Sequence, residues 1–142
     1  MKKLFMTNES DYTLLILRIA LAAVMLPHGL QKTLGYFDGP GFDGAMSFLT
    51  GLGIPAIIAM LVILAESLGA LGLLFGFLTR FCAAAIAVDM IGAVLLVHAK
   101  NGFFAGGGGY EYHIALVGIG IVLLMNGGGA WSIDGIIQKK LR

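Results

Sequence analysis

The chain has 142 residues, of which 58% are hydrophobic and 12% are charged, and its formal net charge is +1. Soluble domains carry roughly 25% charged residues, so this composition excludes a soluble globular protein and predicts that lipid surrounds most of the chain. No basic cluster with interleaved aromatic residues occurs, which excludes a typical nucleic-acid-binding surface. Cys82 is the only cysteine, which excludes an internal disulfide or an iron–sulfur cluster built from this chain alone.

The first long apolar stretch covers residues 12–34 and predicts a membrane-spanning helix, since about 20 apolar residues are enough to cross a bilayer. Residues 35–55 then change to glycine, proline and aspartate around a short patterned piece at 45–49. This change predicts a loop that carries a short helix at the membrane surface.

Three further apolar segments predict three more spans. The first of these, at 56–77, follows Pro55, which favours a helix start because the first turn of a helix needs no internal N–H bonds. The next, at 81–99, follows after a tight turn, so the two should form an antiparallel hairpin. The last, at 110–126, comes after a glycine-rich and aromatic segment at 100–109 that we expect to fold back over the end of the bundle.

These segments predict an all-α fold, in which residues 1–142 form a single domain built as a four-helix transmembrane bundle. Lysine and arginine residues concentrate on the cytoplasmic side of membrane proteins. Most of them fall on the predicted side that holds both ends of the chain, so we expect both termini to be cytoplasmic. They are Lys2, Lys3, Arg80, Lys139, Lys140 and Arg142, against Lys32 and Lys100 on the other side.

Three ionisable residues, Arg18, Glu66 and Asp89, lie within predicted spans, each on a different helix. A charge at mid-bilayer costs about 3 kcal/mol or more unless it is paired or hydrated. Helical rise places the three at depths that allow contact, and a guanidinium can bridge carboxylates, so the sequence predicts an Arg18–Glu66 ion pair with Asp89 nearby. Such a cluster serves equally well as a structural clasp or as a proton or ligand site.

A second polar set lies at the opposite, outward end of the predicted bundle. Facing histidines can ligate haem iron, but His98 and His113 flank a glycine-rich loop near water, so the sequence does not favour haem and predicts no metal site. The aromatic residues of this end suit either an interfacial belt or a lid over the flat ring of a quinone. The set consists of His28, Lys32, His98, Lys100, Phe103, Tyr110, Glu111, Tyr112 and His113.

Several short patterns occur in order along the chain. Together they resemble the DoxX family of small bacterial and archaeal membrane proteins, over residues 14–134. The resemblance implies spanning helices in a plasma membrane and a link to oxidoreduction, because a related protein is a subunit of a thiosulfate:quinone oxidoreductase. His113 is not part of the family pattern. The patterns are Leu17-Arg18-Ile19, His28-Gly29-Leu30-Gln31-Lys32, Glu66, Leu78-Thr79-Arg80, His98, Gly102-Phe103-Phe104 and Gly108-Gly109-Tyr110-Glu111-Tyr112.

The leading functional hypothesis is therefore a membrane subunit of a quinone-linked redox system, whose outward end holds a quinone-like or small anionic ligand. His28 or His98 would hydrogen-bond a quinone oxygen, and Glu111 would relay a proton, since acid–base groups act within about 3 Å of the reacting atom. The other expected ligand contacts are Lys32, Phe103, Tyr110, Tyr112 and His113.

Two other kinds of function fit the same residues. One is a non-catalytic binding or scaffold protein, whose partner is another membrane or redox protein. The other is a small transporter or lipid-binding protein that works as a homo-oligomer, because four spans without paired broken helices do not make an inverted-repeat transporter in one chain. Whether the protein is an enzyme stays open at this point.

Overall fold

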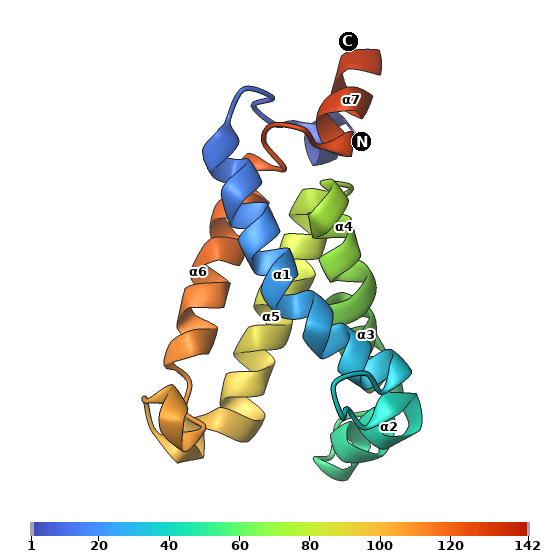
Figure 1. The fold of residues 1–142 in the computed structure, drawn as a ribbon, viewed down its shortest axis with the longest axis vertical. Coiled ribbons are helices and arrows are strands. Elements are labelled where there is room, and N and C mark those ends of the chain that lie inside the picture. Colours follow the sequence, from blue (N-terminus) through green and yellow to red (C-terminus); the bar gives the residue numbers. More distant parts are fainter. Residues whose placement is uncertain (1, 142) are drawn as a thin grey trace.

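The computed structural model describes residues 2–141, and within this range the chain forms helices and no strand. Four helical rods lie side by side along the molecule, and both ends of the chain lie at the same end of the bundle (Figure 1). The first rod is α1 (Tyr12–Leu34); the second joins α3 (Ala56–Leu64), η2 (Ala65–Gly69) and α4 (Ala70–Phe75); the third joins α5 (Thr79–Ala93), η3 (Val94–His98) and η4 (Ala99–Asn101); the fourth is α6 (Glu111–Asn126).

The first three rods are each long and apolar enough to cross a membrane, whereas α6 is apolar but has only 16 residues. The predicted all-α fold is confirmed, and α1 has the predicted bounds. The second rod ends at Phe75 rather than at residue 77, because Gly76 adopts a left-handed conformation (φ 66°) that terminates the helix.

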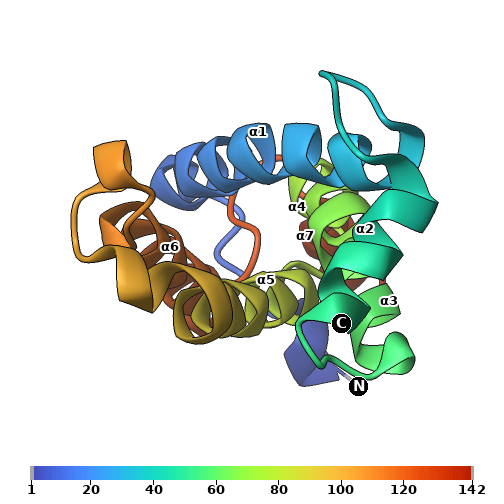
Figure 2. The ribbon, with the colours of Figure 1, turned by 90° about the horizontal axis from the view of Figure 1, so that it is seen from below.

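The rods enclose a common interior. Seen along the bundle, α1 lies opposite α5, with α6 on one side and the α3–α4 rod on the other (Figure 2). The closest packing joins α5 to α6 and α1 to α4 and η2. Every rod therefore contributes one face to the centre of the molecule and another to its surroundings.

Two short helices lie outside the rods. α2 (Gly41–Gly51) occupies the loop in which a short helix was predicted, which confirms that prediction. α7 (Ile133–Lys140) was not predicted, and it packs on the N-terminal segment that contains the turn η1 (Lys2–Phe5). Lys139 forms an ion pair with Glu9 (2.5 Å), and the backbone N–H of Thr7 donates to Gln138 Oε1 (2.7 Å). These contacts tie the two ends of the chain together.

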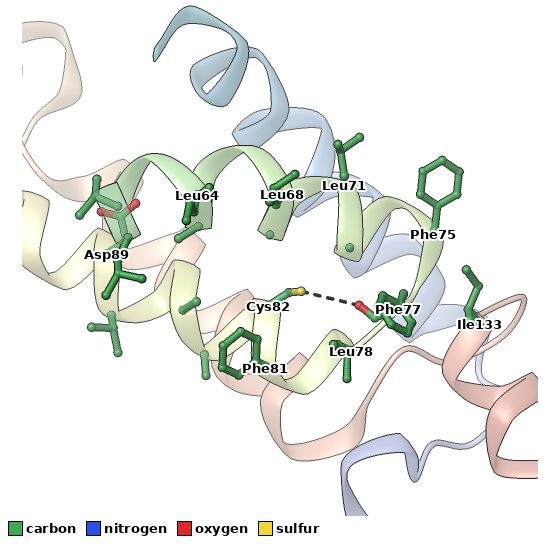
Figure 3. A pocket seen from close by; sticks show the side chains of 18 of the residues that line it. Leu64, Leu68, Leu71, Phe75, Phe77, Leu78, Phe81, Cys82, Asp89 and Ile133 are labelled. Carbon is green, nitrogen blue, oxygen red and sulfur yellow. Dashed lines mark hydrogen bonds between the residues drawn. The ribbon is translucent and has the colours of Figure 1, made fainter. Parts of the chain in front are cut away.

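An apolar groove of about 930 Å³ runs along the outside of the bundle, between the α3–α4 rod and α5 (Figure 3). Asp89 lies at one end of the groove and Ile133 at the other, and Asp89 is the only charged residue in its lining. Other lining residues include Leu64, Ala65, Leu68, Phe75, Phe81 and Ala85.

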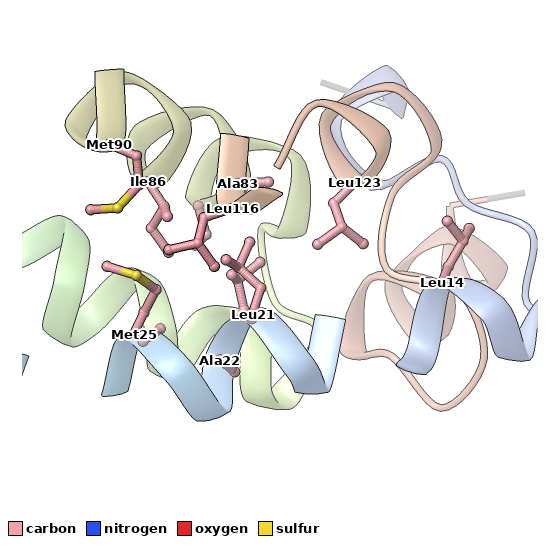
Figure 4. Packing of buried hydrophobic residues seen from close by; sticks show 12 residues of the cluster. Leu14, Leu21, Ala22, Met25, Ala83, Ile86, Met90, Leu116 and Leu123 are labelled. Atoms are coloured by element: carbon pink, nitrogen blue, oxygen red, sulfur yellow. The ribbon is translucent and has the colours of Figure 1, made fainter. Parts of the chain in front are cut away.

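The hydrophobic core fills the space between the rods (Figure 4). Leu21, Ile86 and Leu123 are fully buried and interdigitate at its centre. Since helices in lipid gain little from hiding apolar surface, close van der Waals packing of this kind holds them together. A second, smaller cluster of Ala45, Leu49, Ala59 and Ile63 fixes α2 against α3.

Candidate functional site

A cavity of about 480 Å³, here called the polar cavity, opens among the helices at the end opposite the chain termini. Its volume and mixed lining are typical of small-molecule sites, which are mostly apolar with a few converging polar groups. The apolar wall includes Met25, Leu49, Val62, Met90 and Leu116. The ionisable and tyrosine side chains in its lining are His28 and Lys32 from α1, Glu66 from η2, Asp89 from α5, His98 from η3, and Tyr112 and His113 from α6.

An ion pair joins two of the side chains that line the polar cavity. Lys32 Nζ donates to Glu66 Oε2, and the Glu66 side chain is only 6% exposed while that of Lys32 is 24% exposed. The long, flexible lysine stem lets the ammonium group reach inward from near the end of α1 to a carboxylate in the middle of the second rod. The pair cancels the charge of a carboxylate that would otherwise be costly at this depth.

Arg18 does not pair with Glu66, so the predicted Arg18–Glu66 pair is wrong. Its guanidinium group is buried at the opposite end of the bundle and donates to backbone carbonyl groups at the end of α4 and in the loop after α6. A helix end and a loop leave carbonyl oxygens free to accept such bonds. The acceptors are the carbonyl oxygens of Leu73 (2.8 Å), Leu74 (2.6 Å), Gly128 (3.1 Å), Ala130 (3.2 Å) and Trp131 (3.3 Å).

Asp89 lies beside Glu66 in the polar cavity, as the sequence predicted for these two carboxyl groups. Its carboxyl group hydrogen-bonds the Glu66 side chain, and its buried Oδ2 atom has no other hydrogen-bond partner among residues 2–141. Asp89 also lines the apolar groove, so its carboxyl group stands at the boundary between the two spaces. A buried polar atom of this kind is available to a ligand.

The structure brings all three histidines to the polar cavity. The rings of His98 and His113 face each other, with centroids 4.2 Å apart and planes inclined at 40°, and His28 lines the same space. His98 Nδ1 lies 2.7 Å from the Gly108 carbonyl oxygen, which can only accept, so Nδ1 donates this hydrogen bond. His113 Nδ1 is buried without a hydrogen-bond partner in the described part of the chain.

The segment after the third rod folds into a tight cover for this end. It contains the turn η5 (Ala105–Gly107), and Glu111 Oε1 accepts from the Ala105 N–H (2.7 Å). A Cβ on Gly109 would lie 2.3 Å from the Gly102 carbonyl oxygen, so the loop closes only with glycine there. Its residues Ala105, Gly108 and Gly109 line the polar cavity.

Two of the predicted ligand contacts and the predicted proton relay lie in or beside this cover, outside the lining of the polar cavity. They are Phe103, Tyr110 and Glu111. The ring of Phe103 packs edge-on against that of Tyr110 (5.7 Å, 88°), and the N–H groups of Tyr110 and Glu111 donate to the carbonyls of Gly102 and Phe103. The loop thus uses these residues to hold its own shape.

Sequence reasoning missed two features that shape the site. Glu66 and His98 both lie in single π-helical segments, η2 and η3, which interrupt the α-helical rods. Such π-bulges recur at functional sites because they turn side chains out of the regular helical register. Phe48 and Leu49 of α2 also line the polar cavity, and the only signal for them was the short patterned piece at 45–49.

The DoxX family model matches residues 13–99 of the chain. This chain belongs to the DoxX family. It is 31% identical over 135 residues to "Inner membrane protein YqjF" of Escherichia coli (strain K12), an alignment that covers 95% of this chain and 99% of that protein. The predicted family resemblance is thereby confirmed.

Two further relatives cover nearly the whole chain. "Putative oxidoreductase CatD" of Bacillus subtilis (strain 168) is 27% identical over 94% of this chain and 93% of its own length. "Uncharacterized membrane protein Rv3486" of Mycobacterium tuberculosis is 32% identical over 93% of this chain and 85% of its own length. No solved structure gives a significant match. The family, the relatives and the apolar helices make this chain a multi-pass protein of the bacterial inner membrane.

Proposed function

We propose that this DoxX protein is the membrane subunit of a quinone-linked redox system and that its polar cavity holds a quinone ring. The observation that carries the proposal is the convergence of one ion pair, a second carboxyl group beside it and three histidines on a mostly apolar cavity of about 480 Å³. One relative also has the word oxidoreductase in its name, which supports the class of chemistry.

The chemistry of the cavity suits a quinone. The flat apolar ring packs against residues such as Met25 and Leu116, and its carbonyl oxygens accept hydrogen bonds from donors in the wall. Lys32 Nζ is a charged donor, and a protonated histidine is another. Quinone reduction takes up protons together with electrons, and the carboxyl groups of Glu66 and Asp89 are acid–base groups beside that position. In this form of the proposal Glu111 shapes the cover and does not relay the proton.

The proposed electron partner is another membrane or redox protein. This chain has one cysteine and therefore no dithiol pair of its own to pass electrons. The ring and its ionisable neighbours would exchange protons, while the partner supplies or removes electrons.

We further propose that α6 is a fourth span, that residues 1–142 act as one domain, and that both termini are cytoplasmic. The 16 residues of α6 rise about 24 Å, against a hydrocarbon core of about 30 Å, so slight local thinning of the bilayer would accommodate the helix. The basic residues near both termini favour this orientation.

A binding titration tests the proposal. The protein in lipid nanodiscs is titrated with a tailless benzoquinone, and we expect saturable binding that Lys32→Gln weakens about tenfold, the effect of losing one charge-assisted donor worth about 1.4 kcal/mol. Lys100→Gln is the matched control, because Lys100 is exposed at the same end but does not line the polar cavity.

A second variant separates the loss of the donor from a loss of folding. Lys32→Gln alone leaves the buried Glu66 carboxylate unpaired, whereas Lys32→Gln/Glu66→Gln removes both charges together. We expect the double variant to keep the thermal stability of the wild type and to bind the ring as weakly as the single variant. Absence of binding to the wild type, or equal binding by all four proteins, would overturn the proposal.

A further inference from the structure

The apolar groove is suited to a flexible hydrocarbon chain. Its rim consists of large side chains that face outward, among them Leu68, Phe75 and Phe81, which are 58–64% exposed. Smaller residues, including Ala65 and Ala85, lie between them and leave the groove its depth. The stretch from Leu64 to Phe75 rises about 16 Å, so the groove is long and narrow.

The groove and the polar cavity share part of their lining. Val62 and Asp89 line both spaces, and the close-up of the groove has Asp89 at one end and Ile133 at the other (Figure 3). One ligand can therefore enter both spaces if it has a polar ring at one end and an apolar tail at the other. The carboxyl group of Asp89 lies where ring and tail would join.

The residues shared with the polar cavity favour one kind of occupant for the groove. A helix from a second copy would pack along the rim but would leave the link past Asp89 unused. A hydrocarbon tail would fit along the apolar lining and would reach the ring at the Asp89 end. The groove opens to the outside of the bundle along its length, so such a tail enters directly from the lipid.

We propose that the groove binds the tail of the ligand whose ring occupies the polar cavity, so that the substrate class is an amphipathic, tailed quinone taken from the bilayer. This inference rests on the proposed function. It adds the tail-binding surface and the route of entry, which the ring site alone does not specify.

Photolabelling tests the inference. The probe is a benzoquinone whose alkyl tail carries a diazirine, and labelled peptides are mapped by mass spectrometry on protein in nanodiscs. We expect labels on groove residues such as Leu68 and Phe75, and we expect excess tailless benzoquinone to remove them, because it displaces the ring that holds the tail in place.

A pair of variants sharpens the test. Ala85→Phe fills the middle of the groove and should reduce groove labelling about tenfold, the effect of losing about 1.4 kcal/mol of tail binding. Ala115→Phe is the matched control, because Ala115 is exposed on α6 and lies outside both spaces, and this variant should label like the wild type.

Each alternative outcome overturns the inference in a recognisable way. Groove labelling that tailless benzoquinone does not compete would mean that lipid tails bind there independently of the cavity. Labelling that survives Ala85→Phe, or that spreads over all lipid-facing helices, would mean that the groove is no tail site. An unlabelled groove in a protein that cross-links to a second copy would assign the groove to a dimer. Failure of the proposed function differs from all of these, because the tailless ring then does not bind in the titration.

Discussion

Arg18 and Lys32 lie on the same helix, α1, and each neutralises a different kind of buried polar group. The planar guanidinium of Arg18 spreads its donors over carbonyls from two separate segments, the end of α4 and the loop after α6. The flexible ammonium of Lys32 instead reaches a single carboxylate, that of Glu66. Arg18 thus holds together two segments at the end of the bundle where the chain termini lie. Lys32 neutralises a carboxylate in the polar cavity.

At the residue scale we predict that Arg18→Met lowers the stability of the protein strongly. The substitution removes the guanidinium donor from the carbonyl oxygens of Leu74, Gly128 and Ala130, at a cost of about 3 kcal/mol or more. Arg18→Lys should recover only part of this loss, because an ammonium group lacks the guanidinium fork. Thermal unfolding in detergent measures the effect.

Lys139→Met is the control for Arg18. Lys139 is basic and ion-paired with Glu9 but largely exposed, so its replacement should change stability by only about 0.5 kcal/mol. If Arg18→Met and Lys139→Met were equally stable, the hydrogen bonds from Arg18 to the carbonyl groups would not stabilise the fold as predicted.

At the scale of elements, arginines satisfy two helix ends that lack side-chain caps of their own. Arg18 bonds the last turn of α4, and Arg80 donates to the carbonyls of Leu124 and Met125 at the end of α6 (2.7 Å each). Positive charge is favourable at a helix C-terminus, where carbonyl groups lack partners. Both ends lie on the side of the chain termini, which leaves the opposite end free for the polar cavity.

The contact between α1 and η2 positions Glu66, and Gly29 makes it possible. A Cβ at Gly29 would lie 2.4 Å from the Glu66 carbonyl oxygen and 2.6 Å from the Ser67 Cα, both of them backbone atoms that cannot move aside. We therefore predict that Gly29→Ala destabilises the protein by about 1–3 kcal/mol and weakens binding of the tailless ring. Thermal unfolding and the benzoquinone titration measure the two effects.

Gly118→Ala is the matched control for Gly29. Gly118 lies in α6, and a Cβ there would meet nothing within 4 Å, so alanine should be neutral or stabilise the helix by about 0.5–1 kcal/mol. If Gly29→Ala behaved like Gly118→Ala, the close approach of α1 to η2 would not position the site.

The helices could be predicted from the sequence because the length of an apolar stretch is a local property. The bounds of α1 and the presence of a short helix in the following loop were predicted from composition alone. The pairing of Arg18 could not be predicted, because helical depth says nothing about which carbonyls a helix end leaves free. The π segments that carry Glu66 and His98 also have no compositional signal, since they depend on how the rods pack.

For the histidines, the sequence also predicted the position along the chain but not the arrangement in space. The sequence placed His28, His98 and His113 at one end of the bundle but could not tell whether they converge. The packing of the third rod on α6 brings the ring centroids of His98, in η3, and His113, in α6, to a distance of 4.2 Å. Glu111, two positions before His113, turns instead into the cover loop, because a helix directs residues two apart to different sides.

At the scale of the whole molecule, the proposed topology predicts which residues are accessible from outside the cell. In a Cys82→Ala background, single cysteines are introduced as Lys100→Cys, in the cover segment, and Lys139→Cys, beside the C-terminus. A membrane-impermeant maleimide added to intact cells should label only the first, since both termini are proposed to be cytoplasmic. Labelling of Lys139→Cys alone would reverse the orientation, and labelling of both would contradict the fourth span.

The two ends of the bundle differ in the kind of polar residues that they hold. Arginine contacts and the α7 helix close the side of the termini, while the ion pair, the carboxyl group of Asp89 and the three histidines gather on the other side. In the proposed arrangement, the apolar groove would connect this end to the surrounding lipid, because Asp89 lines both the groove and the polar cavity. This division is what a protein needs if it takes a lipid-soluble ligand from the membrane and exchanges protons with it.

The most direct test of the central claim is to identify what the protein carries out of the membrane. Wild-type, Lys32→Gln and Lys100→Gln proteins are purified in mild detergent, and their organic extracts are quantified by mass spectrometry. We predict a near-stoichiometric quinone in the wild type and in Lys100→Gln, and about tenfold less in Lys32→Gln. A wild-type protein without quinone, or the same quinone content in all three proteins, would contradict a quinone site in the polar cavity.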